Sequence, residues 1–186
     1  MRCRNRPDPG GSPLRLSRAF PPVYDRGAPV RIAGSEVAVD VSGEHRFKAP
    51  IDIVWQTLFD ASALRASIPG CEELREEAPG VHVITARIGV SAVKGQYSGE
   101  VRVIEASRPS LYRLAMSGSG TPGEIQGEAR FDLSEAAAGT VVAYRGDLKA
   151  QGALARVGSQ VLSGAAKLMI GQFFKEMERQ VRDRTP

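Results

Sequence analysis

Hydrophobic residues recur at regular spacing from residue 37 onward. In the segment VAVDVSGEHRF, Val37, Val39 and Val41 alternate with small or polar residues, which predicts a strand with one buried face. The next segment, KAPIDIVWQTLFD, has apolar residues at helical spacing and a proline suited to the first helical turn. A second short helix, ASALRASI, is predicted to stop at Pro69-Gly70, because proline disfavours helical backbone at the preceding residue.

A long run of alternating segments follows the two helices. Turns of hairpin length, most of them containing Gly or Pro, separate these segments, so the strands are predicted to form an antiparallel sheet. In GEIQGEARFDL, Ile125, Ala129 and Phe131 share one face while polar and charged residues take the other, so one face meets water. The predicted strands are residues 72–77, 80–92, 95–106, 109–118, 123–134 and 139–149.

The C-terminal segment predicts one long amphipathic helix. In GALARVGSQVLSGAAKLMIGQFFKEMERQVRDR, apolar residues recur at steps of three and four, and the far end is charged. The order is therefore one strand, two short helices, further strands and a long helix. It predicts an α+β fold in which a curved antiparallel sheet of about seven strands wraps around the C-terminal helix.

Small residues are frequent where that helix and the sheet should pack. The helix contains Gly158, Gly164 and Ala165, the strands contain further glycines, and aromatic residues make up only 6% of the chain. One interpretation is an internal apolar cavity of the kind that holds small molecules. The other is tight packing, because strand glycines also mark bulges and bends that let a sheet coil. The residues alone leave both interpretations open.

Charge is distributed unevenly along the chain. Residues 1–35 contain seven Arg and two Asp, or +5, which leaves −1 of the formal +4 for the remaining 151 residues. A nearly neutral body gives nucleic-acid binding little electrostatic support. Residues 1–36 are predicted to be a disordered Arg- and Pro-rich extension, and residues 37–183 a single domain.

Three interpretations of the extension stay open. It is a transit peptide, a tether to anionic lipid, or else simply a solvated extension or the result of a translation start assigned too early. No apolar run reaches the ~18–20 residues that cross a bilayer, and the N-terminal segment lacks the apolar core of a secretory signal. A cytoplasmic location is expected.

Candidate catalytic chemistry is sparse. The chain has two His and two Cys and none of the short motifs typical of zinc sites or serine hydrolases, so no metal or other cofactor is expected. Cys71, in the turn IPGCEEL, is either a nucleophile with a distant histidine partner or a small apolar residue, and we interpret it as the latter. The acid or base candidates of an enzyme would be His82, Glu100 and Arg130.

Four segments carry a family likeness. GEHRFKAPIDIVWQTLFD, IPGCEEL, GVSAVKGQYSGEVRV and GQFFKEM resemble the family of the CoxG subunit of carbon monoxide dehydrogenase. This CoxG-like family belongs to the START-like, helix-grip (SRPBCC) superfamily, and the resemblance covers about residues 40–183. It implies an apolar, ligand-holding cavity between the sheet and the last helix, without a metal and without catalytic chemistry of its own.

The resemblance also implies partners. Members accompany molybdenum-containing carbon monoxide dehydrogenases or related hydroxylases and help to place them at the membrane, by handling a quinone or another lipid. We therefore expect a non-catalytic carrier of a hydrophobic small molecule, with a peripheral contact at the cytoplasmic face of the membrane. The alternatives are a polyketide cyclase/dehydratase-like enzyme that uses the same cavity, and a ligand-free assembly factor.

The resemblance implies that the rim of the cavity consists of Ile68, Pro69, Gly70, Cys71, Lys94 and Gly95. The lining residues follow from alternation along the strands and spacing along the helix, once this fold is assumed. The expected lining residues are Ile88, Val90, Leu114, Met116, Leu154, Val161, Leu162 and Met169.

Overall fold

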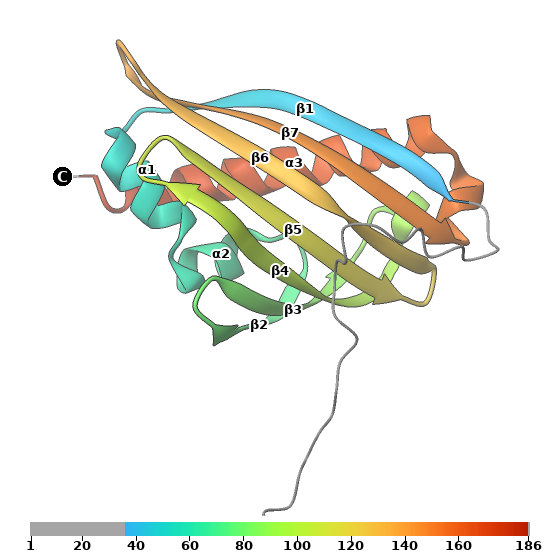
Figure 1. Ribbon diagram of the computed structural model, residues 1–186. Helices are drawn as coiled ribbons and strands as arrows, with labels where there is room; N and C mark the ends of the chain where they lie inside the picture. The colour runs from blue at the N-terminus through green and yellow to red at the C-terminus, as the bar shows by residue number, and fades with distance from the viewer. Residues whose placement is uncertain (1–35, 186) are drawn as a thin grey trace, which may run out of the picture. The chain divides into compact units, whose positions relative to one another are not determined.

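The computed structural model describes residues 36–185. All seven strands form one antiparallel sheet in the order β1-β7-β6-β5-β4-β3-β2, so β7 returns to pair with β1 (Figure 1). The expected α+β fold is confirmed. The predicted extension, apart from Glu36, lies outside the described residues. The elements are β1 (Val37–Phe47), α1 (Ile51–Leu58), α2 (Ala61–Ser67), β2 (Cys71–Ala78), β3 (Val81–Ile88), η1 (Ser91–Val93), β4 (Gly95–Ser107), β5 (Leu111–Gly120), β6 (Gly123–Ala136), β7 (Gly139–Gly152), η2 (Leu154–Val157) and α3 (Ser159–Arg182).

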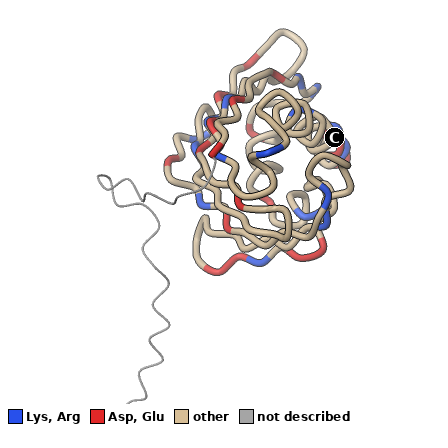
Figure 2. The backbone as a smooth tube through the Cα atoms, turned by 90° about the vertical axis from the view of Figure 1, so that its right-hand side faces the viewer, with Lys and Arg blue, Asp and Glu red and all other residues tan. Residues whose placement is uncertain are grey.

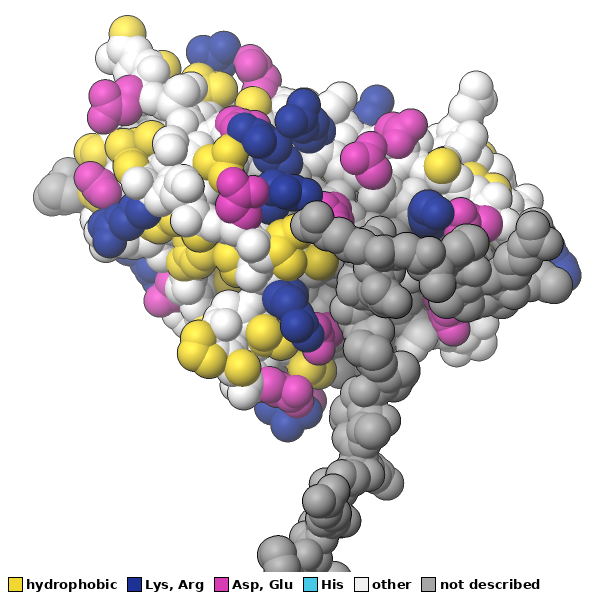
Figure 3. Space-filling view, viewed as in Figure 1, with side chains coloured by type: hydrophobic (Ala, Val, Ile, Leu, Met, Phe, Trp, Pro, Cys, Tyr) yellow, Lys and Arg dark blue, Asp and Glu magenta, His cyan; other side chains and the backbone are white. Residues whose placement is uncertain are grey.

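The sheet curls around one side of α3, as the end view shows (Figure 2). The outward-facing side chains of the central strands form ion pairs, both between strands, such as Arg113 of β5 with Glu128 of β6 (2.6 Å), and along one strand, such as Arg130 with Asp132 of β6 (2.6 Å). Basic and acidic groups are interspersed over this outer face, with small apolar patches between them (Figure 3). The visible part of this face is therefore not a large patch of one sign of charge.

The C-terminal helix begins later than predicted. Leu154–Val157 form a separate 3-10 turn, and Gly158 follows with a φ of 90°, a left-handed conformation that breaks the helix. The N–H of Leu154 donates a hydrogen bond to the carbonyl of Pro122 (3.0 Å), which ties this turn to the sheet. As a result, α3 starts at Ser159, and Leu154 belongs to the buried core instead of the helix face.

The predicted strand over residues 80–92 is too long. β3 ends at Ile88, which pairs with Gly95 at the start of β4. The six residues between them form a loop that contains the 3-10 turn η1. Val90 therefore lies in this loop and not on a strand.

One half of the inner sheet face is filled by aromatic rings. Tyr112 and Phe131 are cross-strand neighbours and stack with ring centroids 4.5 Å apart. Tyr144 packs against Phe174 of α3 at 5.3 Å, and Trp55 of α1 meets Tyr112 at 5.8 Å. Phe174 and Met177 are buried in this cluster. We call this the aromatic half, and it holds the last turns of α3 onto the sheet.

The other half of the inner face carries mostly glycine and aliphatic residues. Along one row across the strands, Gly99 faces Gly118, which faces Ile125. On the neighbouring row, Met116 faces Gly127. We call this the glycine-rich half. Side chains here are too small to fill the space that rings occupy in the aromatic half, so the two halves differ in how densely they pack against α3.

His45 connects β1 to α3 within the aromatic half. Its ring stacks on Phe174 with centroids 5.1 Å apart, and its Nε2 lies 3.7 Å from Oε2 of Glu178. That Nε2 is buried and has no hydrogen-bond partner. Burial lowers the pKa of His45 below its ordinary value, and the carboxylate of Glu178 opposes this shift in part.

The low pKa of His45 predicts a loss of stability in mild acid. Because the folded pKa lies below the unfolded one, the unfolded chain takes up the proton more readily. The contribution of His45 is therefore fully present above pH ~6.5 and declines as the pH falls through the unfolded pKa towards the folded one. Denaturant titrations from about pH 8 to about pH 5 should show that the free energy of unfolding falls less steeply with pH in His45→Phe than in the wild type. Equal slopes would contradict this account.

Candidate functional site

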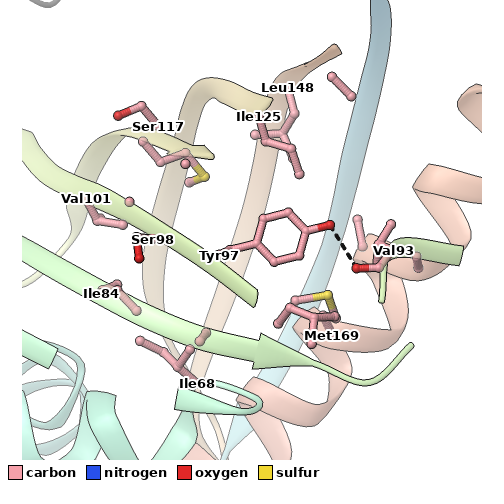
Figure 4. A pocket seen from close by; sticks show the side chains of 18 of the residues that line it. Ile68, Ile84, Val93, Tyr97, Ser98, Val101, Ser117, Ile125, Leu148 and Met169 are labelled. Carbon is pink, nitrogen blue, oxygen red and sulfur yellow. Dashed lines mark hydrogen bonds between the residues drawn. The ribbon is translucent and has the colours of Figure 1, made fainter. Parts of the chain in front are cut away.

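A cavity of about 300 Å³ lies between the glycine-rich half of the sheet and α3. Strands β1 and β3 to β7 contribute to its wall, as does the first half of α3. Most of the lining is aliphatic, for example Ile84, Ile125 and Leu148 from the sheet and Met169 from the helix (Figure 4). Such a surface offers dispersion contacts and excludes water, which suits an apolar guest.

Small residues on both walls explain why this space is open. Gly99 and Gly118 lie directly opposite each other on the sheet, and Ala165 and Ala166 lie on α3. A Cβ on Gly118 would meet no atom closer than 3.7 Å, so this position has unused room. A Cβ on Gly99 would instead clash with the backbone of β5, including the Cα of Gly118 at 2.8 Å. Gly99 is therefore required by the strand geometry, whereas Gly118 mainly leaves space.

Among the described residues that line the cavity, four have polar side chains: Tyr97, Ser98, Glu100 and Ser117. Strand alternation puts the last three at outward positions. There, Ser98 Oγ lies 3.4 Å from the hydroxyl of Thr85, and Glu100 accepts a hydrogen bond from Arg102 (2.7 Å). Tyr97 takes an inward position with Gly99, and its hydroxyl donates a hydrogen bond to the carbonyl of Val93 (2.8 Å; Figure 4).

The short helix α2 brings Ile68 to this cavity. The side chain of Asp60 caps the helix by accepting a hydrogen bond from the N–H of Ala63 (2.8 Å). The hydroxyl of Ser62, the Ala63 N–H and the guanidinium of Arg184 together lower the pKa of Asp60 to about 2, with Ser62 contributing most. Asp60 therefore links α2 to the end of the chain, and Ile68 follows at the helix C-terminus.

Four of the predicted lining residues line the cavity: Ile88, Met116, Leu162 and Met169. Two of them, Leu162 and Met169, are one heptad apart and point to the same side of α3. The other four predicted residues do not line it. They are Val90, Leu114, Leu154 and Val161.

These four misplacements have separate physical causes. Val90 lies in the loop beyond the end of β3, and Leu154 is buried in the turn before α3. Leu114 is inward but packs against the aromatic half. Val161 is 49% exposed, because it precedes the inward-facing Leu162 by one residue, which is about 100° around the helix.

The predicted rim is also only partly placed against the cavity. Ile68 lines it, whereas Pro69, Gly70, Cys71, Lys94 and Gly95 do not. Gly70 has a φ of 70°, and its carbonyl accepts a hydrogen bond from Arg87 N–H (2.8 Å), which fixes the turn against the end of β3.

Cys71 is half-buried, and its Sγ donates to the carbonyl of Glu73 at 3.4 Å. Burial raises the pKa of the thiol above its ordinary value, which disfavours a nucleophilic thiolate.

Sequence reasoning missed Tyr97, Ile84, Ile125, Leu148 and the helix alanines. The alternation on β4 contains a signal for Tyr97, because it shares a face with Gly99 and Val101. Ala165 is one of the small helix residues noted in the sequence, but periodicity does not assign it or Ala166 to the wall. Which half of the sheet they meet depends on the strand register.

The acid and base candidates do not project into the cavity. His82 is on the inner face opposite Val101, but it does not line the cavity. Glu100 and Arg130 take outward positions in ion pairs with Arg102 and Asp132. Within residues 36–185, no group of three His, Cys, Asp or Glu side chains is arranged to hold a metal ion.

Comparison with known proteins identifies the family. Residues 43–182 match the family described as the CoxG subunit of carbon monoxide dehydrogenase. The chain belongs to the CoxG family. A conserved protein from Geobacillus kaustophilus is similar in structure, with a TM-score of 0.73 and 30% identity over 79% of this chain and 96% of that one. None of the curated proteins matches the chain.

Two further solved structures support the START-like fold of this CoxG-family chain. A START superfamily protein from Mycobacterium smegmatis has a TM-score of 0.63 at 14% identity, covering 78% of this chain and 99% of that one. The ZhuI aromatase/cyclase from Streptomyces sp. R1128 has a TM-score of 0.56 at 14% identity, covering 80% and 96%. At these identities the likeness concerns the fold. No helix in the described part of the chain is long and apolar enough to cross a membrane.

The two facing glycines give a matched stability test. Gly118→Ala should raise the free energy of unfolding by roughly 0.5–1 kcal/mol, because it restricts the unfolded chain and meets open space. Gly99→Ala should lower it by roughly 1–3 kcal/mol, because its Cβ meets backbone. Chemical denaturation of both variants measures the difference. If the two glycines respond alike, the assigned strand geometry is wrong.

Cys71→Ser should leave the fold and the uptake of ligand nearly unchanged, because the thiol is neither in the cavity wall nor activated. Circular dichroism and a ligand-binding titration check this. Complete loss of function with intact folding would overturn the assignment of Cys71 as a structural residue.

Proposed function

We propose that this CoxG-family protein is a non-catalytic carrier that binds a hydrophobic small molecule, a quinone or a lipid, in its internal cavity. The single observation that carries the proposal is the apolar space between the glycine-rich half and α3. Its volume, about 300 Å³, falls at the lower end of the usual range for small-molecule sites.

Apolar burial would supply most of the affinity. Each square ångström of apolar surface removed from water contributes about 25 cal/mol, so a ring system or a few prenyl carbons already provide several kcal/mol. The cavity has room for such a portion of a molecule, and a longer tail would have to extend beyond it. Ligands of this class do not need a charged partner in the wall, which agrees with the lining.

Family membership supports the proposed partner. We propose that the carrier assists a molybdenum-containing carbon monoxide dehydrogenase-type enzyme and its association with the membrane, at the cytoplasmic face. On the side that Figure 3 displays, both signs of charge are interspersed, which suits a specific docking partner better than a nucleic acid.

A cyclase or dehydratase activity has less support. It would need an acid or base that reaches the guest. His82 and Arg130 do not line the cavity, and Glu100 borders it from an outward strand position where it pairs with Arg102. The similarity to an aromatase/cyclase concerns the fold alone. A ligand-free assembly factor would be expected to fill its interior with side chains, and the open volume argues against it.

The carrier proposal predicts that purified protein retains, or takes up, a hydrophobic molecule. Organic extraction followed by mass spectrometry should recover a quinone or lipid in an amount comparable to the protein. Gly118→Leu should reduce this recovery strongly, because the side chain would enter the space that Gly118 leaves open.

Gly164→Leu is the matched control. It makes the same chemical change on α3, where a Cβ meets no atom within 4 Å and the residue is exposed. It should not alter recovery. Protein that is empty on extraction and fails to bind added quinones and lipids would refute the carrier proposal. Co-purification of such empty protein with a dehydrogenase would favour the assembly factor.

A further inference from the structure

The cavity contains one polar point in an otherwise apolar wall. Among the lining residues of the described chain, Tyr97 alone combines an inward position with a polar side chain. Its ring projects from β4 into the space beneath the sheet, and the hydroxyl reaches the η1 loop, where Val93 carries the accepting carbonyl (Figure 4). An oriented donor and a backbone acceptor therefore lie next to each other at one end of the cavity.

The ring of Tyr97 is held in place independently of its hydroxyl. Tyr97 lies opposite Gly120 on β5, and a Cβ on Gly120 would meet the ring at 2.8 Å, so the ring covers this bare stretch of backbone. A Cβ on Gly95, two residues earlier, would meet Pro122 at 2.9 Å and the Tyr97 ring at 3.5 Å, so the ring also packs over Gly95. The hydroxyl can therefore change its hydrogen-bond partner without the ring leaving its position.

Burial keeps the hydroxyl a donor. It raises the pKa of Tyr97 above its ordinary value, so the phenol retains its proton well above neutral pH. Val93 is itself buried, which makes its carbonyl costly to leave without a donor. A guest group that draws the Tyr97 hydroxyl away from Val93 must therefore give this carbonyl another donor or forfeit part of its affinity.

The donors and acceptors at this end of the cavity distinguish a guest that carries a carbonyl from a guest that carries a hydroxyl. A guest carbonyl can accept from Tyr97 but has no proton to give, so it withdraws the donor from Val93 and leaves that carbonyl unpaired. A guest hydroxyl accepts from Tyr97 and donates to Val93 at the same time, because a hydroxyl group is both donor and acceptor. Of these two guest groups, only the hydroxyl hydrogen-bonds to Tyr97 and still leaves the Val93 carbonyl paired.

We infer that Tyr97 and the Val93 carbonyl form a recognition point for a hydroxyl group on an otherwise apolar guest. This inference rests on the proposed carrier function and adds to it an orientation of the bound guest. The hydroxyl end lies at the η1 loop, and the apolar part extends towards Met116 and Leu148. For a guest that exists in two redox forms, the hydroxyl-bearing reduced form is the one that this end of the cavity favours.

Three probes that share one ring system test the inference by isothermal titration calorimetry. They are naphthalenes that carry a methyl, an acetyl or a hydroxyl group at the same ring position. In a purely apolar cavity the methyl compound should bind most tightly, because the hydroxyl compound must give up water. We expect the opposite order in the wild-type protein: the hydroxyl compound should bind more tightly than both the methyl and the acetyl compound.

Tyr97→Phe should reverse this preference. It preserves the ring over Gly120 but removes the donor, so binding of the hydroxyl compound should weaken about tenfold, while binding of the methyl compound changes less than about twofold. Tyr144→Phe is the matched control, because it makes the same change on the inner sheet face outside the cavity wall. It should leave all three affinities unchanged.

The following results would contradict the inference. Tighter binding of the methyl or acetyl probe by the wild type overturns it while leaving the carrier function intact. Equal weakening of all three probes in Tyr97→Phe would mean that Tyr97 only shapes the wall, and this too overturns the inference. Binding of none of the probes overturns the inference, and the extraction experiment then decides separately whether the carrier function stands. If Tyr97→Phe fails to fold, the order of the three probes in the wild type decides.

Discussion

The packing of α3 against an unevenly filled sheet is the constraint on which the rest of the structure depends. The second half of the helix inserts Phe174, Met177 and Val181 among the rings of the aromatic half. Its first half runs along strands whose inward positions are often glycine. Because α3 is rigid and its second half is anchored, its first half cannot move closer to the sheet. The volume that larger side chains would fill therefore remains as a cavity.

The sequence predicted the order of the elements well, because each strand and helix has its own local signal. Valines alternate along β1, Pro69-Gly70 ends α2, and hairpin turns separate the central strands. The errors arose where one residue overrides a periodic pattern. Gly158 adopts a left-handed conformation and delays α3, although the apolar spacing continues through it. Periodicity alone does not show such a break.

The position of the cavity was harder to predict than its existence. Glycine and aromatic residues are interleaved along the sequence, and their separation into two halves appears only when the strands are aligned. Gly99, Gly118 and Gly127 come from three different strands, and a shift of one residue would send each of them to the other face. Alternation located Met116, and helical spacing located Leu162 and Met169. Tyr97 required the register, because its hydroxyl matters only through its contact with the η1 loop.

The division of the inner face also separates two tasks that a smaller protein would have to combine. The close-packed rings and the buried end of α3 sit apart from the space available to a guest, so the fold does not need an occupant to hold together. Such a protein can persist both empty and loaded. The proposed carrier function requires a protein that stays folded after it has released its ligand, and a close-packed half that does not line the cavity is consistent with that requirement.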